Sequence, residues 1–222
     1  MFPIVLGVAI LGHAVAALLY AVLISDAAAA RVVYYGSKIL VNAIPLVWVF
    51  GVQRQAFRLP RPNARGVAVG VGVGLIIGGV MVGLYYLGLR GMLDPDGLAA
   101  KADHYGAREH FFLFAAFLCL ANSGLEEYYW RWFVFGSLRR LMKLPAAVVV
   151  SALAFTLHHI VVLAVYFPNP ALVLFFNAGV FAGGCVWAIL YHKYGTIYAP
   201  WVSHLLVDVA IMVVAHDLLF NQ

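Results

Sequence analysis

The sequence has few charged residues and few cysteines, and both shortages narrow the class of protein. Only 10% of its 222 residues are charged, whereas 65% are hydrophobic and the mean hydropathy is +0.96. A soluble domain has about 25% charged residues, so this composition indicates an integral membrane protein. The two cysteines, Cys119 and Cys185, both lie in apolar stretches and do not form the pattern of a disulfide framework.

Linkers and low-complexity tracts are also missing, and the longest connection, residues 90–110, is short and mixed in charge. A membrane-spanning helix needs about 20 apolar residues. Seven runs approach this length, at roughly 2–24, 32–52, 66–89, 111–135, 145–167, 171–191 and 197–219. We therefore expect an all-α fold, a polytopic transmembrane helical bundle of about seven spans, with residues 1–222 forming a single integral membrane domain.

Acidic residues are absent from three of the connections between these runs. The connections after the second, fourth and sixth runs hold eight basic residues, namely Arg54, Arg58, Arg61, Arg65, Arg139, Arg140, Lys143 and Lys193. Basic residues concentrate in cytoplasmic loops, so we expect a multi-pass protein of the cell membrane with a cytoplasmic N-terminus. The formal net charge of +5 then reflects this loop bias and contact with anionic lipid, and we expect no nucleic acid partner.

Glycine recurs every fourth residue in the third apolar run, at Gly66, Gly70, Gly74 and Gly78. Small residues at this spacing lie on one face of a helix and let a neighbouring helix approach closely. A phosphate-binding loop would require a lysine and a strand before the helix, and neither is present. The pattern predicts helix packing.

Two adjacent carboxylates, Glu126 and Glu127, interrupt the apolar run 111–135. A charged group in the middle of a membrane span costs several kcal/mol, roughly 3 on insertion scales, so each of these carboxylates needs a partner or a polar cavity. Residues four apart share a helix face, which predicts an ion pair between Glu127 and Arg131. Glu126 points about 100° away and is the carboxylate left for chemistry.

Two later runs also place polar groups four residues apart. Phe155 and His159 share one helix face, and His204 and Asp208 share another. A carboxylate beside an imidazole accepts from one ring nitrogen and fixes the tautomer, so Asp208 is expected to orient His204. His158 lies about 100° round the helix from His159 and is expected to be a packing or gate residue.

These residues form three motifs in order on successive apolar runs. The segment Glu126-Glu-Tyr-Tyr-Trp-Arg131 has the pattern EExxxR, Phe155-Thr-Leu-His-His159 has FxxxH, and His204-Leu-Leu-Val-Asp208 has HxxxN/D. In these motifs the chain resembles the CaaX-protease and bacteriocin-processing family of glutamic intramembrane proteases. The resemblance covers about residues 111–215.

The resemblance implies that the protein is an intramembrane endopeptidase that uses no cofactor. Glu126 and His159 would activate a water, and His204 with Asp208 would stabilise the oxyanion. Where the family often has asparagine, this chain has Asp208, which has no donor unless it is protonated. Asp208 is therefore expected to orient His204 rather than to donate to the oxyanion, while Glu127 and Arg131 support the catalytic neighbour.

Two other functions remain open from the residues alone. Two histidines with carboxylates make a plausible zinc set, as in a zinc-dependent intramembrane metalloprotease, although no HExxH motif is present. A transporter, or a non-enzymatic scaffold of the immunity type, would use the same polar cluster to bind a proton, an ion or a partner. Transporters often contain inverted repeats, and residues 1–110 show no relation to residues 111–222.

The expected partners are the lipid bilayer and a membrane-anchored or lipidated protein or peptide substrate. The substrate candidates are a lipidated C-terminal tail, a leader peptide and a C-terminal anchor helix. The sequence does not choose among them.

Overall fold

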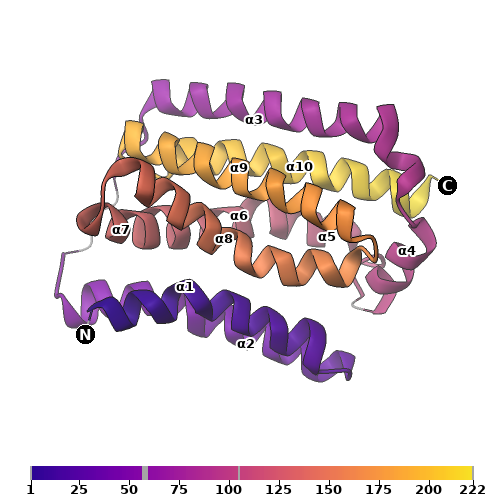
Figure 1. Ribbon diagram of the computed structural model, residues 1–222, viewed down its shortest axis with the longest axis horizontal. Helices are drawn as coiled ribbons and strands as arrows, with labels where there is room; N and C mark the ends of the chain where they lie inside the picture. The colour runs from indigo at the N-terminus through magenta and orange to yellow at the C-terminus, as the bar shows by residue number, and fades with distance from the viewer. Residues whose placement is uncertain (1, 57–59, 105, 222) are drawn as a thin grey trace. The chain divides into compact units, whose positions relative to one another are not determined.

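The computed structural model describes residues 2–56, 60–104 and 106–221, and this part of the chain is helical and contains no strand (Figure 1). The long helices are α1 (Phe2–Leu18), α2 (Ala27–Leu46), α3 (Ala64–Leu84), α8 (Leu144–Tyr166), α9 (Pro170–Tyr194) and α10 (Tyr198–Phe220). The shorter ones are α4 (Pro95–His104), α5 (Phe111–Ala116), α6 (Ser123–Glu126) and α7 (Gly136–Leu141). Wider π-helical turns form η1 (Leu19–Leu23), η2 (Val47–Val52), η3 (Tyr85–Leu89), η5 (Phe117–Asn122) and η6 (Glu127–Phe135), and η4 (Arg90–Met92) is a 3₁₀ turn.

Six helices of the described residues are long and apolar enough to cross a membrane, and they match six of the seven expected runs. They are Phe2–Leu23, Ala27–Val52, Ala64–Met92, Leu144–Tyr166, Pro170–Tyr194 and Tyr198–Phe220. The all-α polytopic fold is therefore confirmed. The remaining run, residues 111–135, is also helical throughout but changes repeatedly between α and π turns, so no single α-helix there approaches membrane length.

The chain forms two compact units, and each unit is built from two separate stretches of sequence. Unit 1 consists of Met1–Arg61 and Tyr128–Ile189, and unit 2 consists of Pro62–Glu127 and Leu190–Gln222. The expectation of a single integral membrane domain stays a prediction.

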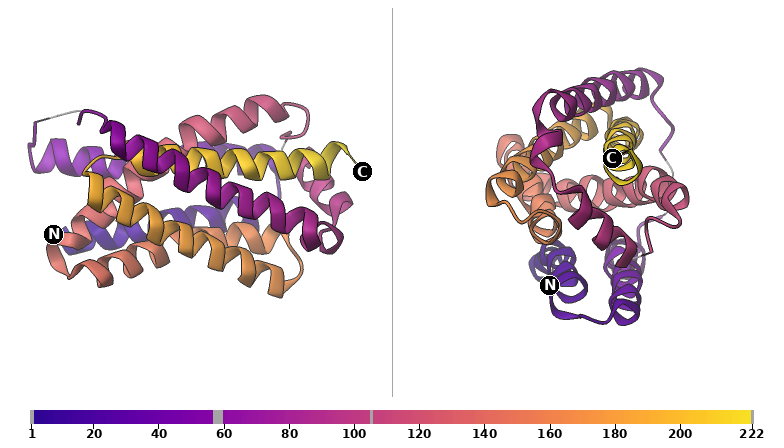
Figure 2. Two further views of the ribbon diagram at one scale, coloured as in Figure 1. Left: turned by 90° about the horizontal axis from the view of Figure 1, so that it is seen from above. Right: turned by 90° about the vertical axis from the view of Figure 1, so that its right-hand side faces the viewer.

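In unit 1, α1 packs against both α2 and α8, and Figure 2 shows α1 beside α2. The hydroxyl of Tyr129 donates to the carbonyl of Ala9 at 2.7 Å and so ties α1 to η6. Gly184 of α9 lies close to Ala152 of α8, since a Cβ placed on Gly184 would be 3.1 Å from the Ala152 Cβ. Helices in a bilayer associate through such close packing because lipid gives them no hydrophobic driving force.

In unit 2, α3 lies along α10 (Figure 1). The glycine stripe of α3 faces α10. Gly66, Gly70, Gly74 and Gly78 are the buried residues of α3. A Cβ on Gly70 would collide with the carbonyl oxygen of Ala199, and a Cβ on Gly74 would lie 2.8 Å from the carbonyl oxygen of Ser203. The packing role predicted from the glycine spacing is confirmed, and the partner is the helix that carries His204.

Replacement of Gly74 by alanine tests this close approach. We expect Gly74→Ala to lower the free energy of unfolding by about 1 to 3 kcal/mol, because backbone atoms of Ser203 would have to move. Gly72→Ala is the matched control on the same helix, since a Cβ there meets nothing within 4 Å. The control should be neutral or slightly stabilising because alanine is the better helix former. Thermal unfolding in detergent measures both, and equal stability of the two variants would contradict the packing assignment.

Candidate active site

The two adjacent glutamates lie at a junction between two kinds of helical turn. Glu126 ends α6 and Glu127 begins η6. Both are buried, with 7% of Glu126 and none of Glu127 exposed. The side-chain amide of Asn122 donates to Glu126 Oε1 at 3.0 Å from one turn earlier. A buried carboxylate requires such donors because it has lost its hydration.

His204 of α10 is the partner of Glu127. Its Nδ1 lies 2.8 Å from Glu127 Oε1, and only 4% of the residue is exposed. A carboxylate ion has no proton to give, so Nδ1 is the donor and the ring orientation is fixed. This buried hydrogen bond joins residues that are far apart in the sequence.

The other ring nitrogen of His204 lies near two more carboxylates. Nε2 is 3.8 Å from Glu126 Oε2 and 3.7 Å from Asp208 Oδ1. These distances allow electrostatic attraction but exceed a hydrogen bond. The orienting hydrogen bond expected from Asp208 is thus made by Glu127, while Asp208 lies beside the opposite nitrogen. Spacing along α10 brings Asp208 near the ring, but it gives no information about a residue on another helix.

Trp201 docks the start of α10 onto the helix that carries the glutamates. Its indole Nε1 lies 3.2 Å from the carbonyl oxygen of Leu120 and 3.1 Å from Ser123 Oγ. Gly124 permits this contact, since a Cβ there would be 3.1 Å from the same nitrogen. Trp201 precedes His204 by one turn, so these contacts help to set the position of the imidazole.

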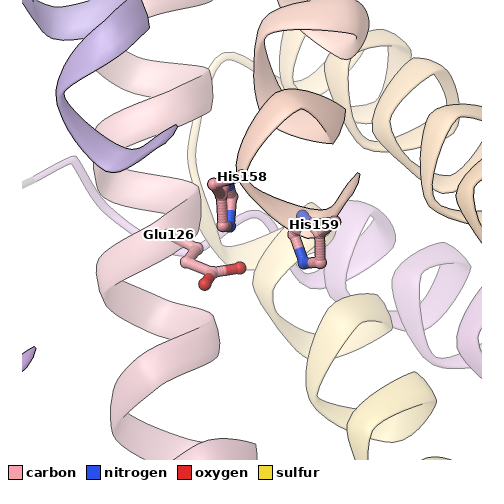
Figure 3. Close-up of side chains that lie close together, drawn as sticks. All are labelled: Glu126, His158 and His159. Atoms are coloured by element: carbon pink, nitrogen blue, oxygen red, sulfur yellow. The ribbon is translucent and has the colours of Figure 1, made fainter. Parts of the chain in front are cut away.

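Unit 1 contains the second motif, in which His159 and its neighbour His158 differ in environment. His159 is half-buried, and its Nδ1 lies 3.0 Å from the carbonyl oxygen of Phe155. His158 is buried and stacks on Trp130, with ring centroids 5.8 Å apart and planes 4° from parallel. The two imidazoles are themselves adjacent, with centroids 4.0 Å apart, and Figure 3 shows them on α8. This stacked environment agrees with a packing role for His158.

Arg131 is also in unit 1 and is almost completely buried, with 2% exposed. Its guanidinium carbon lies 4.6 Å from the ring centre of Phe155 and 5.2 Å from that of Trp187. Cation–π contacts of this kind are worth about 2 kcal/mol when water is excluded. The ion pair of Arg131 with Glu127 stays a prediction.

Sequence reasoning assigned no contact to Asn122, Trp201 or His13. Asn122 precedes Glu126 by four residues, so the spacing rule applied to Glu127 would have found it. His13 of α1 packs edge-on against Tyr129, with ring centroids 4.6 Å apart, and no local pattern indicates this contact.

Several of these residues carry atoms that bind metal ions. Imidazole nitrogen and carboxylate oxygen are the zinc ligands of catalytic sites. Glu126, His158 and His159 each have a ligand atom of one of these types. Figure 3 labels all three. The zinc alternative therefore calls for a test by chelation.

The comparisons with known proteins agree with the three motifs. Residues 108–210 match the family described as Type II CAAX prenyl endopeptidase Rce1-like. The resemblance to the CaaX-protease and bacteriocin-processing family is thereby confirmed over this segment, which contains all three motifs. The matched segment, which is less than half of the chain, is thus similar to a family of CAAX prenyl endopeptidases. No curated protein and no solved structure matches the chain.

Glu127 provides a test of the buried hydrogen bond to His204. We expect Glu127→Leu to lower the free energy of unfolding by roughly 3 kcal/mol, because a buried polar network loses one member. Glu127→Gln should cost less, since its amide oxygen still accepts from Nδ1–H. Thermal unfolding of both variants in the same detergent gives the comparison, and equal destabilisation would show that the acceptor atom is unimportant.

Proposed function

We propose that the protein is a glutamic intramembrane endopeptidase, which hydrolyses a peptide bond of a prenylated or otherwise membrane-anchored protein. The observation that carries this proposal is the family match over residues 108–210, because all three motifs lie inside it. The substrate class follows from the family's description as a prenyl endopeptidase. A substrate held in the bilayer by its lipid would reach residues on membrane helices directly.

In the proposed reaction, Glu126 and His159 activate a water molecule. Glu126 is a buried carboxylate whose Oε1 accepts from Asn122. His159 Nδ1 lies beside a carbonyl oxygen, which only accepts, so Nδ1 carries the proton and Nε2 is the acceptor of the neutral ring. A carboxylate base and an imidazole acceptor are the groups that general-base catalysis requires.

The water gives a proton to Glu126, and its oxygen attacks the carbonyl carbon of the substrate. The negative charge then moves to the carbonyl oxygen, where His204 stabilises it by donation from Nε2. Because Nδ1 already donates to Glu127, donation from Nε2 requires a proton on both ring nitrogens, which makes the imidazole positively charged. The carboxylate of Glu127 at Nδ1 balances this charge. When the C–N bond breaks, the proton held by Glu126 passes to the leaving amine. Asp208, 3.7 Å from Nε2, helps to hold the charged ring.

The proposed location is the cell membrane, with the N-terminus on the cytoplasmic side. Eight basic residues in alternate connections support this orientation. The bilayer is the first partner, and the lipidated tail of another protein is the second.

Replacement of Glu126 by glutamine tests the proposed base. We expect Glu126→Gln to lower the rate of hydrolysis by about 10² to 10⁴, the usual contribution of a general base, with little change in thermal stability. The assay follows cleavage of a prenylated peptide by the purified protein in lipid nanodiscs, with mass spectrometry of the released fragment. Glu109→Gln is the control, because this exposed carboxylate lies outside the site. Unchanged cleavage by Glu126→Gln would remove the proposed base, and absence of cleavage by the wild-type protein would favour a transporter or scaffold.

Chelation separates the glutamic mechanism from the zinc alternative. We expect hydrolysis to continue after prolonged treatment with phenanthroline, because the proposed side chains supply both the base and the oxyanion donor. Elemental analysis of the purified protein accompanies the assay. Loss of activity that returns on addition of zinc, together with one zinc per chain, would overturn the glutamic mechanism.

A further inference from the structure

Asn122 differs from the other asparagines of the membrane helices in where its side chain donates. Asn42 and Asn177 donate from Nδ2 to the carbonyl oxygens of Lys38 and Val173, each four residues earlier and each at 2.8 Å. This bond to the preceding turn is the common solution for a polar side chain within a helix. Asn122 instead donates forward, to the Glu126 side chain at 3.0 Å.

Asn122 lies where a π-helical turn meets the α-helical turn that carries Glu126. Asn122 ends η5, and the next residue, Ser123, begins α6 and donates its backbone N–H to the carbonyl of Leu118. π-Helical turns are frequent at functional sites.

The hydrogen bond also distinguishes the two oxygens of Glu126. Oε1 accepts from Asn122, whereas Oε2 lies 3.8 Å from His204 Nε2. A carboxyl group held at one oxygen cannot rotate without losing that bond, so Oε2 is kept beside the imidazole. The amide of Asn122 can donate to Oε1 because an ionised carboxylate accepts hydrogen bonds at its oxygens.

We propose that Asn122 is a positioning residue that holds the Glu126 carboxylate with Oε2 directed toward the reacting water. This inference rests on the proposed function, because it assigns the atom through which Glu126 acts. Asn122 itself does not touch the substrate. Its contribution is to the rate of the chemical step and not to substrate binding.

Kinetic constants of Asn122 variants test the positioning. Asn122→Leu keeps the volume but removes the donor, and we expect kcat to fall about 10²-fold, as when a catalytic group is misplaced by about 1 Å. KM should change by less than about threefold, since the binding energy that the bound substrate and the transition state share is retained. Asn122→Gln keeps an amide that can reach four residues along a helix, so it should recover at least a tenth of the wild-type kcat.

Asn177→Leu is the matched control, because it removes a buried asparagine that donates to its own helix. Asn177→Leu should not show the selective fall in kcat, whatever its effect on thermal stability. Equal kcat values for Asn122→Leu and the wild-type protein, with Glu126→Gln inactive in the same assay, would overturn the positioning role while leaving the proposed function intact. An equal fall in kcat for Asn122→Leu and Asn122→Gln would also overturn the positioning role, because the amide donor would then be irrelevant.

An infrared measurement tests the contact without any assay of hydrolysis. The difference spectrum between the wild-type protein and Glu126→Gln isolates the Glu126 carboxyl band. We expect this band to move when the same pair is compared in the Asn122→Leu background, because the hydrogen bond to Oε1 is lost. A band at an unchanged frequency would overturn the inference, whether or not the protein hydrolyses a peptide.

Discussion

The hydrogen bond between Glu127 and His204 is the interaction on which the geometry of unit 2 depends. Its two atoms are 2.8 Å apart, and both residues are buried. A carboxylate placed within a membrane segment is stable only when a donor or an opposite charge meets it. The imidazole meets Glu127 from a helix distant in sequence, so the position of α10 and the stability of the acidic segment are linked.

Other contacts in unit 2 hold α10 where this bond can form. The glycine stripe of α3 lets the backbone of α10 approach at Ala199 and Ser203, just before His204. Trp201 fixes the same part of α10 to the carbonyl of Leu120 and the hydroxyl of Ser123. The close approaches at Gly70 and Gly74 and the polar contacts of Trp201 therefore act on the same part of α10, which directly precedes the imidazole.

The two adjacent glutamates differ in environment and hence in the roles proposed for them. Glu127 is completely buried and bonded to a ring nitrogen, which suits a residue that orients another side chain. Glu126 has one oxygen bonded to Asn122 and the other near His204 Nε2 beyond hydrogen-bond distance, which suits a base. The two environments differ because side chains of successive residues in a helix point in different directions.

Composition and spacing along the chain were enough to predict the membrane class, six of the long helices, the glycine packing face and the three motifs that the family match contains. These features depend on composition and on spacing within one helix, and both can be read from the chain. The packing of the helices was needed to show that Glu127 makes the hydrogen bond to His204 Nδ1, whereas Asp208 lies 3.7 Å from Nε2. It also decided that Trp201 docks α10 and that π-helical turns divide the segment around the glutamates. Such features depend on which side chains of different helices meet, and local periodicity contains no information about that meeting.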